Sequence, residues 1–205
     1  MRKGIETTAR LRCLRPVLNR WTALNRQLGE RWSKDGNAPW WYNERALISV
    51  FAGAVWQSDG YAFEEYSETK RGKKRPYAGR IDLEFVAGQY EFRAEVKQCW
   101  LAATKPGDRS SYVRGFMEEA KADVRRCRPD GTRRLAIVFG SPYLAQHRKA
   151  EMDHRIEWLV VQAKKIRVDI GADAVAWTFP SLRRFPMDRD GVYPGIIAWI
   201  KEVRR

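Results

Sequence analysis

The feature that most constrains this chain is residues 80–97, in which apolar and charged side chains alternate. Leu83 and Phe85 belong to the apolar set, and the same alternation returns after Gly88-Gln89. A period of two is typical of a strand with one buried face. A glycine in the first of two loop positions is the preference of a type II′ turn. The stretch therefore predicts a β-hairpin whose apolar face needs a covering layer.

The position of the turn determines which residues face each other across this hairpin. Counting outward from the turn, the apolar pairs are Ile81–Val96, Leu83–Ala94 and Phe85–Phe92, and the charged pairs are Arg80–Lys97, Asp82–Glu95 and Glu84–Arg93. Like charges directly opposite each other destabilise a sheet, so the first two charged pairs need an explanation. A divalent cation between Asp82 and Glu95 would replace their repulsion with coordination. Mg²⁺ prefers carboxylate oxygens and keeps several waters.

An Asp on one strand and Glu-x-Lys on the next resemble the signature of the PD-(D/E)XK nuclease superfamily. The matching residues are Asp82 and Glu95-Val96-Lys97, and the sequence departs at Ile81, where the name-giving pattern has Pro. The resemblance implies an α/β fold that is restriction-endonuclease-like, with a mixed central sheet flanked by helices. It also implies hydrolysis of nucleic-acid phosphodiesters with Mg²⁺, for which Mn²⁺ would substitute.

The same resemblance assigns roles to the motif residues. Asp82, Glu95 and the backbone carbonyl of Val96 are expected to hold one or two Mg²⁺ ions. A metal of this kind polarises the phosphate and lowers the pKa of a bound water. Lys97 is expected to position or help deprotonate that water, or to stabilise the developing charge.

Two further expectations concern Glu44 and the pKa of Lys97. In the nuclease family the helix before the catalytic sheet often supplies an extra acidic metal ligand, and Glu44 is the candidate here. The alternative is that Glu44 only interacts with the dipole of its helix. To act as a base, Lys97 needs a pKa well below about 10.4. The facing Arg80 and the metal are both expected to lower it.

The other elements follow from periodicity and from turn residues. Helices are expected from Pro16 to Trp32 and over residues 44–55, 112–127 and 151–166, and strands over residues 61–66, 135–140 and 174–179. Asn43 has the residue type and position of an N-cap. The last apolar segment, residues 192–200, fits either a strand or a helix. This order predicts an α/β sandwich. We divide the chain into a basic N-terminal helical extension, residues 1–38, and a nuclease-like domain, residues 39–205.

Charge indicates the class of partner. The 205 residues carry a formal net charge of +14, which favours a polyanion such as nucleic acid. No apolar run approaches the roughly 18 residues of a membrane span. The three cysteines lack zinc-finger spacing, which favours reduced thiols and a cytoplasmic location. The Arg-rich start also resembles a mitochondrial transit peptide. The helix that follows has the pattern of a structural element, which disfavours this alternative.

Basic segments supply the candidate phosphate contacts. Residues 70–75 carry five positive charges in six positions just before the hairpin. The full candidate set is Lys70, Arg71, Lys73, Lys74, Arg75, Arg80, Arg20 and Arg26. The alternative for the loop is a solvated turn. The aromatic run Trp40-Trp41-Tyr42 could stack on bases, although anchoring the preceding linker to the core is the favoured interpretation.

These observations lead to three functional hypotheses. The first is a Mg²⁺-dependent endonuclease acting on DNA. A homodimer is compatible with this hypothesis, because each site would cut one strand. The second is a nucleic-acid-binding protein of the same fold that does not cut and serves as an architectural or assembly subunit. The third is a structural protein in which the hairpin is only an amphipathic sheet edge.

Overall fold

A computed structural model of the chain describes residues 2–72, 75–103, 109–127, 130–145, 151–182, 184–188 and 191–204. Within these ranges the strands are β1 (Lys3–Thr7), β2 (Tyr61–Lys70), β3 (Tyr77–Ala87), β4 (Tyr90–Ala102), β5 (Arg133–Tyr143), β6 (Ala174–Thr178) and β7 (Ile196–Glu202). The α-helices are α1 (Arg15–Trp32), α2 (Glu44–Trp56), α3 (Arg109–Arg125) and α4 (Met152–Asp169). Short 3₁₀ helices are η1 (Ala9–Leu14), η2 (Ser33–Asp35) and η3 (Pro39–Trp41).

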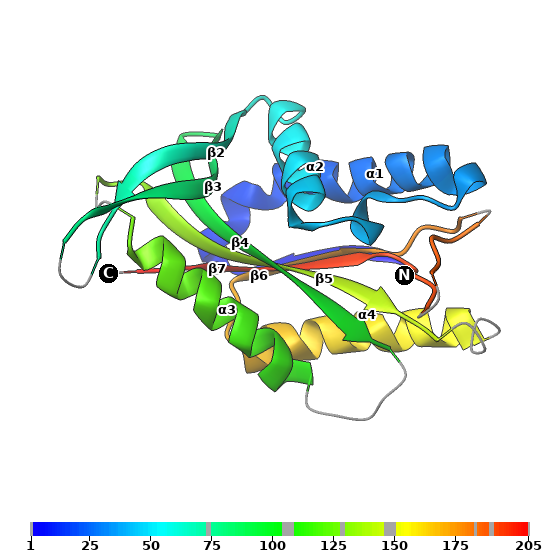
Figure 1. The fold of residues 1–205 in the computed structure, drawn as a ribbon. Coiled ribbons are helices and arrows are strands. Elements are labelled where there is room, and N and C mark those ends of the chain that lie inside the picture. The colour runs from blue at the N-terminus through cyan, green and yellow to red at the C-terminus, as the bar shows by residue number, and fades with distance from the viewer. Residues whose placement is uncertain are drawn as a thin grey trace.

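The strands form one sheet in the order β1-β6-β7-β5-β4-β3-β2. Strands β4 and β5 run parallel, and the other neighbouring pairs are antiparallel. Helices α1 and α2 cover one face of the sheet, and α3 and α4 cover the other (Figure 1). This arrangement confirms the expected class, a mixed α/β fold with helices flanking a central sheet.

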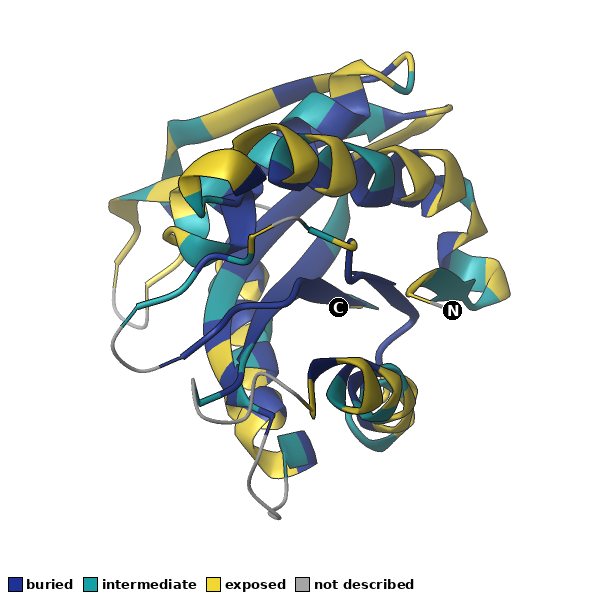
Figure 2. Cartoon of the chain, turned by 90° about the vertical axis from the view of Figure 1, so that its right-hand side faces the viewer, coloured by how far each residue is buried: buried dark blue, intermediate teal, exposed yellow. Residues whose placement is uncertain are grey.

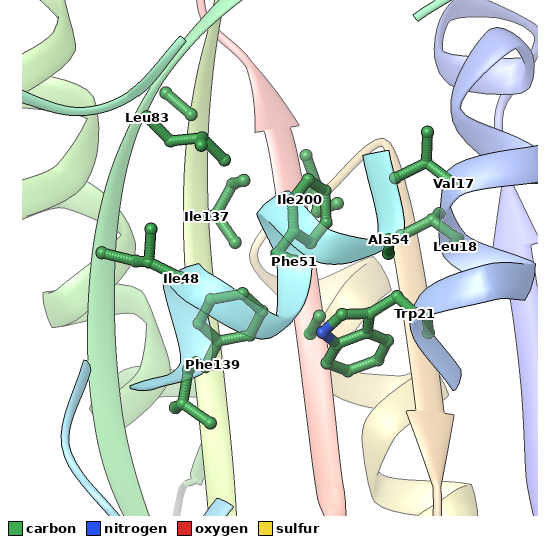
Figure 3. Close-up of a cluster of buried hydrophobic side chains, with 14 of the residues drawn as sticks. Val17, Leu18, Trp21, Ile48, Phe51, Ala54, Leu83, Ile137, Phe139 and Ile200 are labelled. Carbon is green, nitrogen blue, oxygen red and sulfur yellow. The ribbon is translucent and has the colours of Figure 1, made fainter. Parts of the chain in front are cut away.

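Two layers of buried side chains hold the helices to the sheet. The central strands and the inward sides of the helices are buried, while the outer helix surfaces are exposed (Figure 2). On the α1/α2 face, Trp21 stacks on Phe139 with ring centroids 5.8 Å apart, and Phe51 meets Phe85 edge-on at 5.7 Å. Figure 3 shows this cluster, to which both helices and several strands contribute. Strand β5 is buried on both sides, as its continuous apolar run indicates.

The hairpin forms with the predicted register next to its turn. Leu83 pairs with Ala94, and Phe85 pairs with Phe92, whose ring stacks on it at 5.0 Å. Gly88 has a φ of +61°, whereas Gln89 is not among the residues with positive φ. That combination fits the type II′ turn, in which only the first loop residue needs positive φ.

The N-terminal 38 residues belong to the same core as the rest of the chain. Strand β1, which the sequence did not predict, pairs antiparallel with β6. Leu14 and Leu18 are fully buried in the cluster that contains Phe51. Residues on both sides of position 38 therefore share one buried core, because β1 extends the sheet and α1 packs beside α2.

The apolar residues of α1 do not all lie in the core. Val17 and Trp21 are buried, whereas Leu24, Leu28 and Trp32 line a groove of about 740 Å³ between α1 and α2.

The structure also decides between strand and helix for the last apolar segment. The segment of ambiguous period forms β7, which lies between β5 and β6.

Candidate active site

The sheet opens at Asp82, the first candidate metal ligand. The ladder between β3 and β4 ends at Leu83–Ala94, and the Asp82 carboxylate accepts a hydrogen bond from the Val96 backbone N–H at 2.8 Å. On the other side of β3, Glu65 stands opposite Asp82 with a φ of +49° and interrupts the β2–β3 ladder. A non-glycine residue in this region is uncommon and often marks a functional site.

This opening changes the predicted register beyond the turn. Leu83 packs in the α1/α2 layer, but Ile81 packs in the α3/α4 layer. The prediction that Ile81 shares an apolar face with Leu83 is therefore wrong. The predicted pairs Ile81–Val96, Asp82–Glu95 and Arg80–Lys97 are wrong as well, because the β3–β4 ladder does not extend to them. The Asp82 side chain takes the place of a backbone acceptor, which ends the alternation at this point.

Glu95 is buried beside Lys70 and Cys127 on the α3 side of the sheet. Its side chain is 3% exposed, and the Lys70 ammonium lies 2.6 Å from its Oε1. The Cys127 thiol lies 3.9 Å from the same oxygen. Burial raises the pKa of Glu95 to about 7, helped by the negative charge of Asp82 and opposed by Lys70. Asp82 lies close enough for its charge to act on Glu95, and its carboxylate is bound to the backbone of Val96, the next residue of β4.

Lys97 projects to the same side of β4 as Glu95 and forms an ion pair with Asp123 of α3 at 3.1 Å. Burial lowers the pKa of Lys97, but the hydrogen bond to Asp123 and the charges of Asp123, Glu44 and Asp82 outweigh burial, so the pKa is raised. The expected lowering by Arg80 is wrong, since Arg80 pairs with Glu65. Lys97 is therefore a cation held among carboxylates.

Glu44 reaches the site from the first turn of α2. The Asn43 side chain accepts a hydrogen bond from the Ala46 N–H at 3.1 Å, which confirms the predicted N-cap and fixes the helix start. The Glu44 carboxylate accepts a hydrogen bond from the Gln98 backbone N–H at 2.9 Å. Burial raises the pKa of Glu44, Lys97 lowers it, and Asp82 raises it further. Glu44 therefore shares an electrostatic environment with the motif residues.

Sequence reasoning missed Asp123 and assigned Lys70 a different role, contact with phosphate. Asp123 holds Lys97, and Lys70 holds Glu95, although both lie far from the hairpin turn in sequence. The Gln98 side chain donates to the Tyr42 carbonyl at 3.0 Å and thus ties β4 to the segment before α2. Asp123 could have been identified as a candidate from its position in the last turns of the helix that precedes β5.

The candidate metal ligands have suitable chemistry but are not assembled into a full cage. Among the residues that the structure describes, no group of three or more His, Cys, Asp or Glu side chains is placed to hold an ion. Asp82, Glu95 and the Val96 carbonyl would offer only oxygen atoms, which Mg²⁺ prefers, and waters usually complete its shell. The donor set therefore fits Mg²⁺, with the Glu95 oxygen bound by Lys70 instead.

The candidate phosphate contacts are distributed unevenly. Arg20, Arg71 and Arg75 are exposed, while Arg26 pairs on the surface with Glu30 at 3.3 Å. Lys70 differs from the expectation, because its side chain is buried at the candidate site instead of facing solvent. Lys73 and Lys74 lie outside the described residues.

The aromatic residues before α2 lie in two different environments. Trp40 is fully buried, and its indole N–H donates to the Tyr193 carbonyl at 3.1 Å, so it anchors the linker as the favoured interpretation has it. Tyr42 is 43% exposed and lines the groove between α1 and α2.

Comparisons with protein-family models, with curated proteins and with solved structures find no match to this chain. Across the described residues, the helices are too short or too polar to serve as membrane spans.

The raised pKa of Glu95 predicts a pH dependence of stability in the absence of metal. With a folded pKa near 7 and an ordinary value of 4.5, the folded state binds more protons than the unfolded state between these two pH values. The free energy of unfolding should then fall as pH rises through this window, by an amount of the order of 3 kcal/mol. Urea unfolding in EDTA at a series of pH values measures this slope.

The matched variant is Glu95→Gln, which cannot ionise and should lack this part of the slope. Titrating groups that do not interact with Glu95 contribute equally to both proteins and cancel in the difference. Parallel stability curves for wild type and variant would rule out the raised pKa.

Proposed function

We propose that this protein is a metal-dependent nuclease with a restriction-endonuclease-like fold that hydrolyses phosphodiester bonds in DNA. The observation that carries the proposal is that Asp82 and Glu44 accept hydrogen bonds from the backbone N–H groups of Val96 and Gln98, the residues that follow Glu95 and Lys97 on β4. A lysine among three carboxylates is unusual as a purely structural device, since each buried charge requires a partner.

The element order gives independent support. Helix α2 is followed by the antiparallel strands β2, β3 and β4, then by α3 and by β5, which runs parallel to β4. This order agrees with the α/β sandwich and mixed sheet that the motif resemblance implies. The motif residues lie on the two central strands of that unit, and the helices on both faces supply the supporting groups.

The chain's own residues have separable roles in this proposal. Asp82, Glu95 and the Val96 carbonyl would hold Mg²⁺ or Mn²⁺, and Glu44 would bind a second ion or a metal-bound water. The bound ion supplies Lewis-acid activation of the scissile phosphate and of a water. Lys97, kept protonated by Asp123, orients the attacking water and stabilises negative charge on the phosphate as the P–O bond breaks. A neutral Lys97 base is disfavoured by its raised pKa.

The charge of the chain supports nucleic acid as the substrate. A net charge of +14 attracts a phosphate backbone. Exposed arginines such as Arg71 and Arg75 flank the candidate site in sequence. This attraction does not depend on base sequence, so it supplies affinity without defining specificity.

One observation favours a second candidate function, a nucleic-acid-binding protein that does not cut. Lys70 and Asp123 already neutralise Glu95 and Lys97 without a metal. Such a closed network could persist as a structural element after loss of activity.

Incubation of supercoiled plasmid with the protein and Mg²⁺, Mn²⁺ or EDTA tests the proposal. We expect nicked or linear DNA with either metal and intact plasmid in EDTA. Binding to a labelled duplex in EDTA should persist and should weaken steeply with salt, because phosphate contacts release counterions. Salt-dependent binding without cleavage under any metal condition would establish the second candidate. Binding that does not change with salt would contradict both.

A further inference from the structure

Lys70 and Glu95 form an ion pair beneath the surface of the candidate site. Their side chains are 9% and 3% exposed, and the ammonium nitrogen lies 2.6 Å from Glu95 Oε1. Lys70 was expected in the exposed basic loop, where a flexible lysine contacts phosphate. Its burial against a candidate metal ligand requires another explanation.

The surrounding backbone is built to hold the lysine in this position. Lys70 is the last residue of β2, and the next N–H, from Arg71, donates to the Arg126 carbonyl at 2.7 Å. This bond ties the end of β2 to the end of α3. On the neighbouring strand, a Cβ at Gly79 would lie 2.7 Å from Lys70 Cδ and 2.9 Å from Cγ. Gly79 therefore leaves the space through which the lysine stem reaches Glu95.

Stability alone does not explain such a pair. Replacing a buried ion pair with apolar residues is often neutral or stabilising, because removing two charges from water is costly. Glu95 also lies within the field of Asp82, so a cation here reduces the repulsion between two carboxylates. A bound divalent ion would serve the same electrostatic purpose.

We propose that Lys70 is an internal counter-cation that occupies Glu95 in the metal-free protein and competes with the divalent ion for its carboxylate. The inference rests on the proposed function in treating Glu95 as a metal ligand. Metal loading then requires the ammonium to give up Glu95 Oε1. Lys70 acts as a positioning residue that holds Glu95 Oε1 and keeps the carboxylate only weakly metal-binding until the ion arrives.

The variant Lys70→Met tests the competition directly, because methionine keeps an unbranched apolar stem and removes the charge. We expect it to bind Mn²⁺ about 10- to 100-fold more tightly than wild type. Partners that orient a metal ligand change affinity by this factor, and the sign is reversed here because Lys70 competes with the ion. Titration calorimetry and Mn²⁺ electron paramagnetic resonance on nucleic-acid-free protein give the dissociation constants. Lys70→Arg, which keeps the charge, and Lys165→Met, which alters an exposed pair on α4, should stay near the wild-type value.

Thermal unfolding provides a second readout. In EDTA, Lys70→Met should melt below wild type, because Asp82 and Glu95 then lack a cation. Mn²⁺ should raise its melting temperature more than that of wild type. If the variant does not fold in EDTA, Gly79→Ala replaces it. The added methyl displaces the lysine stem, and the substitution removes no charged group from the protein. Gly79→Ala should likewise tighten Mn²⁺ binding.

The outcomes separate this inference from the proposed function. Unchanged or weaker Mn²⁺ binding in both Lys70→Met and Gly79→Ala overturns the role of Lys70, even if the protein cleaves DNA. Tighter Mn²⁺ binding in these variants supports that role, even if no nucleic acid is cut and the nuclease proposal fails. Absence of Mn²⁺ binding in wild type and in both variants overturns the inference.

Discussion

Lys97→Ala is expected to reduce the rate of DNA cleavage about 10²- to 10³-fold, the usual cost of removing one group that stabilises charge in the transition state. The variant removes the cation that Asp123 holds beside the candidate ligands. Glu95→Ala should cause a loss at least as large, because it also removes a metal ligand. Single-turnover cleavage of a labelled duplex in Mg²⁺ measures both effects without interference from product release.

DNA binding should remain largely intact in these variants. Each changes the net charge by a single unit out of +14, so the affinity in EDTA should shift little, and the salt slope of Lys97→Ala should fall by about one at most. Lys165→Ala provides a matched lysine control, since Lys165 pairs with Asp169 on the surface of α4. It should cleave like wild type. Parallel loss of binding and cleavage in Lys97→Ala, with normal behaviour of the control, would assign Lys97 to binding instead of chemistry.

The parts of the fold that depend on local pattern could be predicted from the sequence. The period-two alternation and the Gly88-Gln89 turn gave the hairpin, and the Asn43 cap gave the start of α2. Strand β1 could not be found in this way, because five mixed residues in a basic terminus carry no clear period. Its pairing with β6 depends on a partner about 170 residues away.

The candidate site could be predicted only along the hairpin. Alternation assumes an unbroken ladder, and it failed at Ile81 because the Asp82 side chain replaced a backbone hydrogen bond. The pKa of Lys97 was assigned the wrong direction for a related reason, since its neighbours were taken from strand register alone. Asp123 and Lys70 arrive from α3 and from the end of β2, and only the packing of these elements on the sheet brings them to the motif.

Arg93→Ala is expected to lower the free energy of unfolding by about 3 kcal/mol, near the lower end of the range for breaking a buried ion pair. The guanidinium is 8% exposed and lies 3.1 Å from Glu68, 2.9 Å from Glu84 and 3.0 Å from Asp130. The variant leaves Glu68 as a nearly buried carboxylate that loses this cation. Glu84 and Asp130 are more exposed, so water compensates part of their loss, which places the effect near the lower end. Urea unfolding at neutral pH measures the difference.

The sign of the pH dependence distinguishes this mechanism from simple loss of packing. If unpaired carboxylates cause the destabilisation, the deficit should shrink as pH falls and they become protonated, and Glu68→Gln in the Arg93→Ala background should recover part of it. A cavity left by the missing stem would give a deficit that does not change with pH. Arg26→Ala is the control, because its pair with Glu30 is about half exposed on both sides and such pairs contribute less than about 1 kcal/mol. A deficit for Arg93→Ala as small as that of the control would show that the three carboxylates do not depend on this arginine.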